Sequence, residues 1–302
     1  MNSSQLFQGD NLSVLKHLYK TGYECKIDLI YIDPPFNTGR KDFAYNDSWK
    51  TTYDYLDFLR PRLFWMRELL SEQGSIYVHL DYHVGHYAKI LMDEVFGKEN
   101  FKNEITWRRG NANTNTNSNQ YSRNNDTILF YSKTSDNFFK RQLKPYAKST
   151  LKMYKYDDHD GRGKYRLQEL RDYSVESREN LKRDNRIYVL NGKEYLKQYL
   201  SDKEGTALDC IWEDIPSLQG GSSERLGYAT QKPEALLERI IKASSNEDSI
   251  IADFFAGSGT TGAVAEKLGR KWIMCDNNPK AIDTITKRMN GAEYEHIIEG
   301  ET

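Results

Sequence analysis

The sequence predicts an α/β fold in which buried strands bring polar residues to the carboxyl edge of one open sheet. One observation is the apolar run 28–32, which ends in the motif Asp33-Pro34-Pro35-Phe36. The other is a strand, glycine turn, helix and second strand over residues 249–276, closed by an acidic residue. Ligands of open α/β sheets collect at that edge, so the two stretches predict a binding site there.

Strand and helix patterns alternate through the first 132 residues. We expect strands over 4–10, 28–32, 74–81, 104–107 and 127–132, and helices with amphipathic spacing over 11–18, 53–70 and 86–96. Asp10 stands between the first strand and the first helix, so it is a candidate cap for that helix. The polar tract 111–120 contains nothing to bury, and we expect a flexible loop there.

The Asp33-Pro34-Pro35-Phe36 turn combines restricted backbone geometry with an acidic and an aromatic side chain. Two consecutive prolines lack N–H donors and hold φ near about −65°, so the turn neither pairs as a strand nor continues as a helix. The Pro34 carbonyl is then left to accept a hydrogen bond from a ligand. With Asp33 as a second acceptor and Phe36 as a stacking face, the turn suits a planar ring that carries an exocyclic amine. A surface turn after a strand is the simpler alternative.

The middle of the chain is basic and its flanks are acidic. Residues 102–190 contain 19 Lys and Arg against 11 Asp and Glu, a net charge of +8, while residues 1–101 carry −3 and residues 191–302 carry −6. A solvated charged surface would explain this pattern, but we favour a phosphate-facing segment inserted into an enzyme body. From 134 to 222 the periodicity weakens, so we predict one domain over 1–133 with 223–302 and a second over 134–222.

The composition excludes several classes of site. The three cysteines are widely spaced and include no Cys-x-x-Cys pair, so neither a disulfide framework nor a zinc site is expected. His79, His83 and His86 are not accompanied by a cysteine, and we predict no metal. No apolar run approaches the roughly 20 residues that span a bilayer, and no cationic leader is present. We therefore expect a cytosolic protein without a membrane partner.

The last 80 residues contain the second half of the predicted site. Gln231-Lys232-Pro233 forms a cap-like turn into the helix 234–241. The strand 249–255 leads into the turn with Gly257, Gly259 and Thr260, and the strand 271–276 ends on Asp276, 19 residues after Gly257. In this arrangement the glycines let the backbone approach a nucleoside-bearing ligand, and the acid accepts hydrogen bonds from ribose hydroxyls.

The two motifs together resemble the S-adenosylmethionine-dependent amino-methyltransferases of DNA. The catalytic motif comes first, a variable domain second, the Gln231-Lys232-Pro233 helix third and the cofactor turn last, an order similar to their β group, which includes modification subunits of type III restriction systems. The resemblance covers about residues 1–135 and 223–302. It implies a Rossmann-like S-adenosylmethionine methyltransferase fold with circularly permuted motif order and an inserted target-recognition domain over 134–222.

The resemblance also implies a role for each motif residue. Asp33, Pro34, Pro35 and Phe36 are the implied catalytic residues: Asp33 and the Pro34 carbonyl accept the hydrogens of a base amine, and Phe36 stacks on a base flipped out of the duplex. For the cofactor S-adenosyl-L-methionine, Asp10 is the implied partner of the adenine amine and Asp276 of the ribose hydroxyls. The other implied cofactor residues are Asp33, Gln231, Lys232, Pro233, Asp253, Phe255, Gly257, Gly259 and Thr260.

The residue at position 33 bears on which base is methylated. Relatives with Ser there lean toward the 4-amino group of cytosine, whereas Asp33 favours adenine. The predicted function is site-specific methylation of the 6-amino group of adenine in double-stranded DNA, with cytosine-N4 methylation as the alternative. A non-catalytic nucleic-acid-binding module and an RNA or protein methyltransferase are further hypotheses. The resemblance leaves open a homodimer and a cognate restriction subunit.

Overall fold

The computed structural model describes residues 3–40, 47–111, 119–170 and 172–300. The chain forms two compact units, one from residues 1–140 and 209–302 and one from residues 141–208. Most of the tract 111–120, for which the sequence predicts a flexible loop, lies outside the described residues. Among the helices of the described ranges, none is long and apolar enough to cross a membrane.

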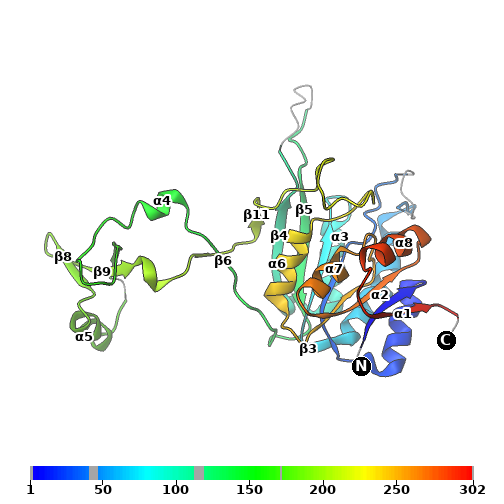
Figure 1. Cartoon of the computed structure of the whole chain (residues 1–302), viewed down its shortest axis with the longest axis horizontal. Coiled ribbons are helices and arrows are strands. Elements are labelled where there is room, and N and C mark those ends of the chain that lie inside the picture. The colour runs from blue at the N-terminus through cyan, green and yellow to red at the C-terminus, as the bar shows by residue number, and fades with distance from the viewer. Residues whose placement is uncertain (1–2, 41–46, 112–118, 171, 301–302) are drawn as a thin grey trace. The chain divides into compact units, whose positions relative to one another are not determined.

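The larger unit is built on one sheet with helices on both of its faces (Figure 1). The described residues supply nine strands to this sheet, and all run parallel except β5, which is antiparallel to both of its neighbours. In order across the sheet the strands are β11 (Ile211–Trp212), β4 (Phe101–Arg108), β5 (Asn125–Ser132), β3 (Leu70–Leu80), β2 (Ile27–Ile32), β12 (Ile250–Asp253), β13 (Lys271–Asp276), β1 (Ser4–Gln8) and β14 (Tyr294–Ile298).

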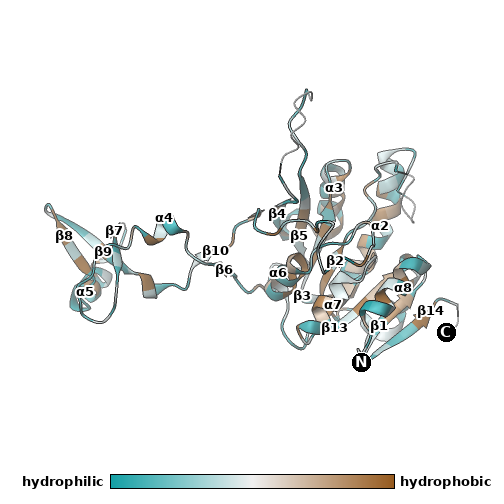
Figure 2. Ribbon diagram, turned by 45° about the horizontal axis from the view of Figure 1, so that its top comes forward, coloured by the Kyte–Doolittle hydropathy of each residue, from teal (hydrophilic) through white to brown (hydrophobic). Residues whose placement is uncertain are grey.

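The two faces of the sheet have separate apolar cores. One core contains buried residues of α1 (Asn11–Leu18), α2 (Thr52–Leu69) and α3 (Gly85–Phe96), and the other contains those of α6 (Glu234–Ser244), α7 (Thr260–Lys267) and α8 (Pro279–Arg288). Successive residues of a strand point to opposite faces, so Ile30 and Ile32 of β2 enter the first core while Leu29 and Tyr31 enter the second. Figure 2 shows brown, apolar residues along the central strands.

The predicted α/β architecture is confirmed, and the strands around the site lie in an order that agrees with the permuted motif order. β1 pairs with β13, and β13 pairs with β12, as the permuted motif order requires. Two elements that follow Asp276, α8 and β14, were not predicted from the sequence. The signal for α8 was present, because Asn278 caps it with its side chain and Pro279 occupies its first turn. Shorter helical turns lie at Tyr19–Tyr23, Lys98–Asn100 and Leu200–Asp202.

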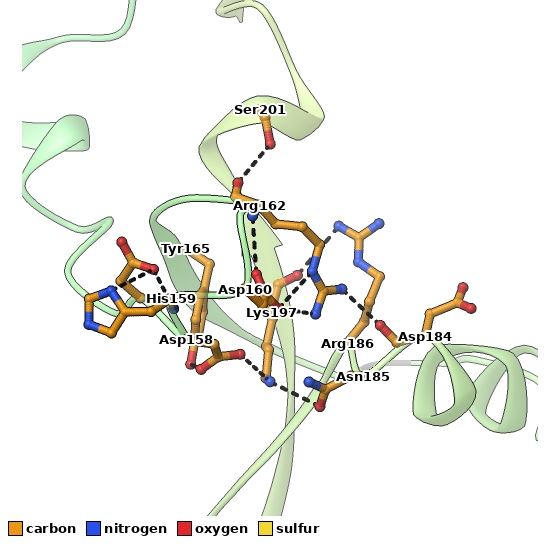
Figure 3. Close-up of polar contacts among 11 residues, drawn as sticks. Asp158, His159, Asp160, Arg162, Tyr165, Asp184, Asn185, Arg186, Lys197 and Ser201 are labelled. Atoms are coloured by element: carbon orange, nitrogen blue, oxygen red, sulfur yellow. Dashed lines mark hydrogen bonds and ion pairs between the residues drawn. The ribbon is translucent and has the colours of Figure 1, made fainter.

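The smaller unit consists of short elements around a few aromatic rings. β7 (Tyr165–Glu169), β9 (Lys193–Tyr199) and β8 (Ile187–Leu190) form an antiparallel sheet, β6 (Leu143–Lys144) pairs with β10 (Thr206–Ala207), and α4 (Lys148–Leu151) and α5 (Val175–Arg183) complete the unit. Figure 3 shows how Lys197 and Tyr165 both donate to Asp158, and how Lys197 also reaches Asn185 at 3.3 Å. The Lys197 side chain is buried, so these contacts compensate the cost of removing its charge from water.

The boundaries between the units differ from the predicted ones. The smaller unit begins at 141 rather than 134 and ends at 208 rather than 222. The backbone N–H groups of Phe138 and Lys140 donate to carbonyls of Gln73 and Ala243, which fastens residues 138–140 to the larger unit. On the other side, β11 pairs with β4, and Trp107 Nε1 donates to the carbonyl of Ile215 at 2.7 Å. These irregular segments belong to the larger unit through main-chain pairing, which hydrophobic periodicity does not reveal.

Candidate functional site

Four neighbouring parallel strands bring their carboxyl ends to one cavity of about 440 Å³. β2 is followed by Asp33, β12 ends on Asp253, β13 ends on Asp276, and Asp10 lies just after β1. The predicted site residues that line the cavity are Asp10, Asp33, Pro35, Lys232, Asp253, Phe255, Gly257, Thr260 and Asp276. Its volume falls in the range of small-molecule sites, roughly 300–1,000 Å³. The structure therefore brings the two distant motifs into one site.

Asp33 presents an unsatisfied acceptor in this cavity. One of its carboxylate oxygens forms an ion pair with the ammonium group of Lys232. The other, Oδ1, is buried and has no hydrogen-bond partner among the residues that the structure describes. Because a buried acceptor without a partner costs free energy, this oxygen is suited to receive a hydrogen from a ligand.

The other predicted residues lie around the cavity rather than in its lining. Phe36 stacks on the imidazole of His79, with ring centroids 6.2 Å apart. Gln231 donates to the Glu224 carbonyl and accepts from the N–H of Leu226, so it organises the preceding loop. Pro233 is the residue before α6. Pro34 and Gly259, both described, are likewise absent from the lining.

Glycines shape the turn between β12 and α7. Gly257 and Gly259 have φ of +52° and +72°, in the left-handed region that favours glycine. A Cβ on Gly259 would lie 2.9 Å from Ile285 Cγ1 of α8. A third glycine that was not part of the prediction, Gly262, follows three residues after Gly259 and completes the Gly-x-Gly-x-x-Gly spacing. A Cβ on Gly262 would meet the Met274 side chain at 2.3 Å, so this third glycine permits close packing of α7 on β13.

Asp253 is buried and Asp276 is partly buried, and both carboxylates accept hydrogen bonds from backbone N–H groups. Asp276 accepts from the N–H of Gly257 at 2.8 Å and of Asn278 at 2.9 Å. Burial raises its pKa, although these backbone hydrogen bonds oppose the shift. Asp253 accepts from Thr261 Oγ1 and from the N–H of Phe255. Burial raises the pKa of Asp253 to about 7, against the lowering effect of the two hydrogen bonds.

The raised pKa of Asp253 predicts a pH-dependent cost to stability. A carboxyl group that binds its proton more tightly in the folded state stabilises the fold at low pH and loses that contribution as pH rises toward the folded pKa. Asp253→Asn is neutral at every pH, so its melting temperature should exceed that of the wild type increasingly from pH 5 to pH 8. From pH 5 to the folded pKa of about 7 is a span of two units, so the wild type should lose on the order of 3 kcal/mol of its free energy of unfolding over this range. A constant difference between the two proteins across this range, measured by calorimetry, would contradict the shift.

Arg62 is a site residue that the sequence analysis missed. It projects from α2 into the cavity lining, is buried, and donates to Asn11 Oδ1 at 2.6 Å and to Asp10 Oδ1 at 3.0 Å. Asp10 also caps α1 by accepting from the N–H of Ser13. The signal for Arg62 was its position, because it falls on the same helical stripe as the buried residues Leu59 and Met66. Because burying an unpaired charge is costly, an arginine on the buried face of a helix indicates an ion-pair or hydrogen-bond partner inside the protein.

Aromatic side chains complete the lining. Trp49 and Phe58 pack against each other with centroids 5.0 Å apart, and both border the cavity. Tyr228 lies over the glycine turn, 3.4 Å from where a Cβ on Gly257 would be. Burial, with the nearby charges of Asp276 and Asp33, raises the pKa of Tyr228 to about 12, so its hydroxyl stays protonated. Trp49 and Tyr228 lie outside helices and strands, and no periodicity marked them.

Comparison with known proteins agrees with the resemblance to DNA methyltransferases that the motifs indicate. Residues 27–287 match the DNA methylase family, whose name covers N6 and N4 methyltransferases. The type II methyltransferase M.EcaI of Enterobacter cloacae is 33% identical over 311 residues, covering 92% of this chain and 68% of that protein. The Mod subunit of the type III restriction-modification enzyme StyLTI of Salmonella typhimurium is 31% identical over 359 residues, covering 95% of this chain and 54% of that protein. The chain thus spans about half the length of this Mod subunit.

A solved structure extends the likeness to the fold. The M1.HpyAVI–SAM complex has a TM-score of 0.55 to this structure at 19% sequence identity, over 95% of this chain and 98% of that one. At this identity the similarity shows the fold alone, and the chemistry must be argued from the residues of the site.

Proposed function

The chain belongs to the DNA methylase family, and we propose that it transfers a methyl group from S-adenosylmethionine to the 6-amino group of an adenine in double-stranded DNA. The observation that carries this proposal is the buried Oδ1 of Asp33, which has no partner among the described residues and lies in the cavity. An acceptor in this position is suited to a hydrogen of an exocyclic amine. The Pro34 carbonyl, next in the chain, is proposed to accept the second hydrogen.

The residues of the cavity fit S-adenosylmethionine. Asp276 can accept from the ribose hydroxyls, because its two oxygens accept from a few backbone N–H groups, among them those of Gly257 and Asn278, and retain further acceptor capacity. Asp10, oriented by Arg62, is proposed to accept from the adenine amine of the cofactor. Gly257, which has a left-handed backbone and no side chain, borders the cavity and presents its main chain to the cofactor. When bound, the cofactor supplies an activated methyl group on a sulfonium.

The proposed mechanism depends on positioning and electrostatics. The lone pair of an exocyclic amine is delocalised into its ring, which makes the amine a poor nucleophile. Two acceptors, Asp33 and the Pro34 carbonyl, orient the amine hydrogens so that the lone pair is directed at the methyl carbon, and transfer proceeds by in-line displacement. Lys232 holds the Asp33 carboxylate through its ion pair. Phe36 remains our candidate for stacking on the flipped base, with its ring already supported by His79.

The test is the product of methyl transfer. DNA incubated with the protein and methyl-labelled cofactor should yield 6-methyladenine after hydrolysis to nucleosides. Recovery of 4-methylcytosine would favour cytosine-N4 methylation, the alternative that the family name includes. Asp33 and the Pro34 carbonyl could hold the amine of cytosine in the same way. Absence of label in DNA, with label in RNA or protein, would overturn the proposal.

We further propose that residues 134–222, and chiefly the compact unit 141–208, select the DNA sequence. This unit carries 16 Lys and Arg against 11 Asp and Glu, and base readout requires side chains that are not committed to the cavity. A cognate restriction subunit is a proposed partner, because a relative is named as a type III Mod subunit. A homodimer is likewise a proposal.

The electrostatic part of this proposal predicts a change in salt dependence. Lys182 and Arg183, exposed at the end of α5, should contact phosphates, so replacing both with alanine should flatten the slope of log affinity against log salt by about 1.8. The matched control is Lys20→Ala with Lys26→Ala, which removes two exposed charges at the amino edge of the larger sheet. Equal slopes for the two double variants would exclude α5 from the DNA interface.

A further inference from the structure

Three buried polar side chains form a chain of hydrogen bonds across neighbouring strands. Tyr31 of β2 is joined through its hydroxyl to His79 Nδ1 of β3 at 2.8 Å, and His79 Nε2 is joined to Asp126 Oδ2 of β5 at 3.1 Å. Their exposed fractions are 2%, 0% and 3%. A buried imidazole and carboxylate are costly to desolvate, and the mechanism above uses only the ring of His79, which stacks on Phe36.

The charges around this chain fix the direction of its hydrogen bonds. Burial opposes ionisation of Asp126, but the hydrogen bond from His79 and the positive charges of Arg109 and Lys232 lower its pKa, so its carboxylate is ionised. An ionised carboxylate only accepts, hence His79 donates from Nε2. The neutral imidazole then accepts at Nδ1, and the hydroxyl of Tyr31 is its donor. This leaves the lone pairs of the Tyr31 oxygen open to an incoming proton.

One end of the chain lies at the proposed reaction centre. Tyr31, in β2, lines the same cavity as Asp33, which follows two residues later just after the end of the strand. Burial and then the charges of Asp33 and Asp253 raise the pKa of Tyr31, so its hydroxyl stays protonated. At the other end, Arg109 Nε lies 3.3 Å from Asp126 Oδ1, and the Arg109 side chain is 42% exposed. The chain therefore connects the cavity with the surface.

We propose that Tyr31, His79 and Asp126 form a relay that removes the proton lost by the target amine, an inference that rests on the proposed function. As the amine nitrogen bonds to the methyl carbon, the carbon–sulfur bond breaks and its electron pair stays on sulfur. The N–H bond then breaks and its proton passes to the Tyr31 oxygen, while the hydroxyl proton of Tyr31 moves to His79 Nδ1. Asp126 stabilises the resulting imidazolium until the products leave and the proton returns through Tyr31 to water in the cavity.

Asp33 is less suited to this task because both of its oxygens are committed. One is paired with Lys232, and the other is needed to hold the hydrogen that the amine retains. In this assignment Tyr31 is the catalytic acceptor, and His79 and Asp126 are positioning residues that keep it an acceptor toward the cavity.

The experiment compares single-turnover methyl transfer from pH 5.5 to 8.5 in the wild type, Tyr31→Phe and His79→Gln. Proton transfer by a positioned group contributes about 10²–10⁴-fold, so each variant should lose at least about a hundredfold in rate with cofactor affinity unchanged. The wild-type dependence of the rate on pH is the reference profile. Asp253 titrates in this pH range in the wild type and in both variants, so a pH dependence that the wild type has and His79→Gln lacks is assigned to the relay.

A matched control is available on the next strand. Tyr77 is equally buried and its hydroxyl is 2.7 Å from Ser244 Oγ, but it does not line the cavity. Tyr77→Phe should leave the rate and its pH profile unchanged. If Tyr31→Phe is as active as Tyr77→Phe, the relay is overturned. Each variant lacks only one hydroxyl oxygen, so both should fold like the wild type.

A second readout does not depend on activity. In nitrogen-15 spectra of the unliganded protein, the His79 signals, identified by their loss in His79→Gln, should show a neutral ring with its proton on Nε2. A proton on Nδ1 would overturn the relay even in a fully active enzyme. Wild-type protein that labels no base in DNA would instead contradict the proposed function, while the tautomer would still be measured.

Discussion

Asp33→Ala is expected to abolish methyl transfer while S-adenosylmethionine still binds. The substitution removes the buried acceptor that holds the target amine, and the remaining contacts do not replace it. Loss of one positioned electrostatic contact at a reacting centre costs about 10²–10³-fold, and loss of orientation adds to this. Cofactor affinity should be retained, because Asp276 and the glycine turn are unchanged, and Lys232, freed from its ion pair, can approach the methionine carboxylate.

The control for this result is Asp33→Asn, which keeps the size of the side chain and one carbonyl acceptor. It should retain more activity than Asp33→Ala, although it also loses the ion pair with Lys232. Calorimetric titration with cofactor and single-turnover assays on DNA separate binding from chemistry. If Asp33→Ala loses cofactor binding along with activity, then Asp33 belongs to the cofactor site and its assignment to the amine is wrong.

The sequence predicted the site where backbone constraint and chemistry coincide. Consecutive prolines after an acid, and glycines between a strand and a helix, restrict the chain so strongly that Asp33, Gly257 and Asp276 could be placed at one edge before the strand order was known. In parallel sheets, carboxyl ends of neighbouring strands meet at that edge. Local sequence patterns were therefore sufficient to place the residues at the carboxyl ends of β2, β12 and β13 in one site.

Residues that act across strands were not predictable in the same way. His79 was considered only with other histidines nearby in sequence, whereas its partners Tyr31 and Asp126 are 48 and 47 residues away. Their pairing depends on β5 lying antiparallel beside β3, a register that hydrophobic spacing does not specify. Arg62 was detectable in principle from its place on a buried stripe, but its partner Asp10 follows from tertiary packing.

Asp276→Ala is expected to weaken S-adenosylmethionine binding by about 10- to 100-fold. Hydrogen bonds to a charged group contribute about 1.5–3 kcal/mol, and each 1.4 kcal/mol is about tenfold in affinity. The substitution also leaves the N–H groups of Gly257 and Asn278 without their present acceptor, which loosens the turn. At saturating cofactor the rate of methyl transfer should recover most of its wild-type value, because Asp33 and its surroundings are not altered.

The pH dependence of cofactor binding distinguishes a direct contact from a general loss of stability. Burial raises the pKa of Asp276, so protonation should begin to remove one of its acceptor oxygens at a higher pH than for an ordinary aspartate. Wild-type affinity should therefore decrease on acidification, and Asp276→Ala should lack that component. Asp283→Ala, which removes an exposed acid from α8, is the matched control and should bind like the wild type. Equal affinities of Asp276→Ala and Asp283→Ala in calorimetric titrations would show that Asp276 does not hold the ribose.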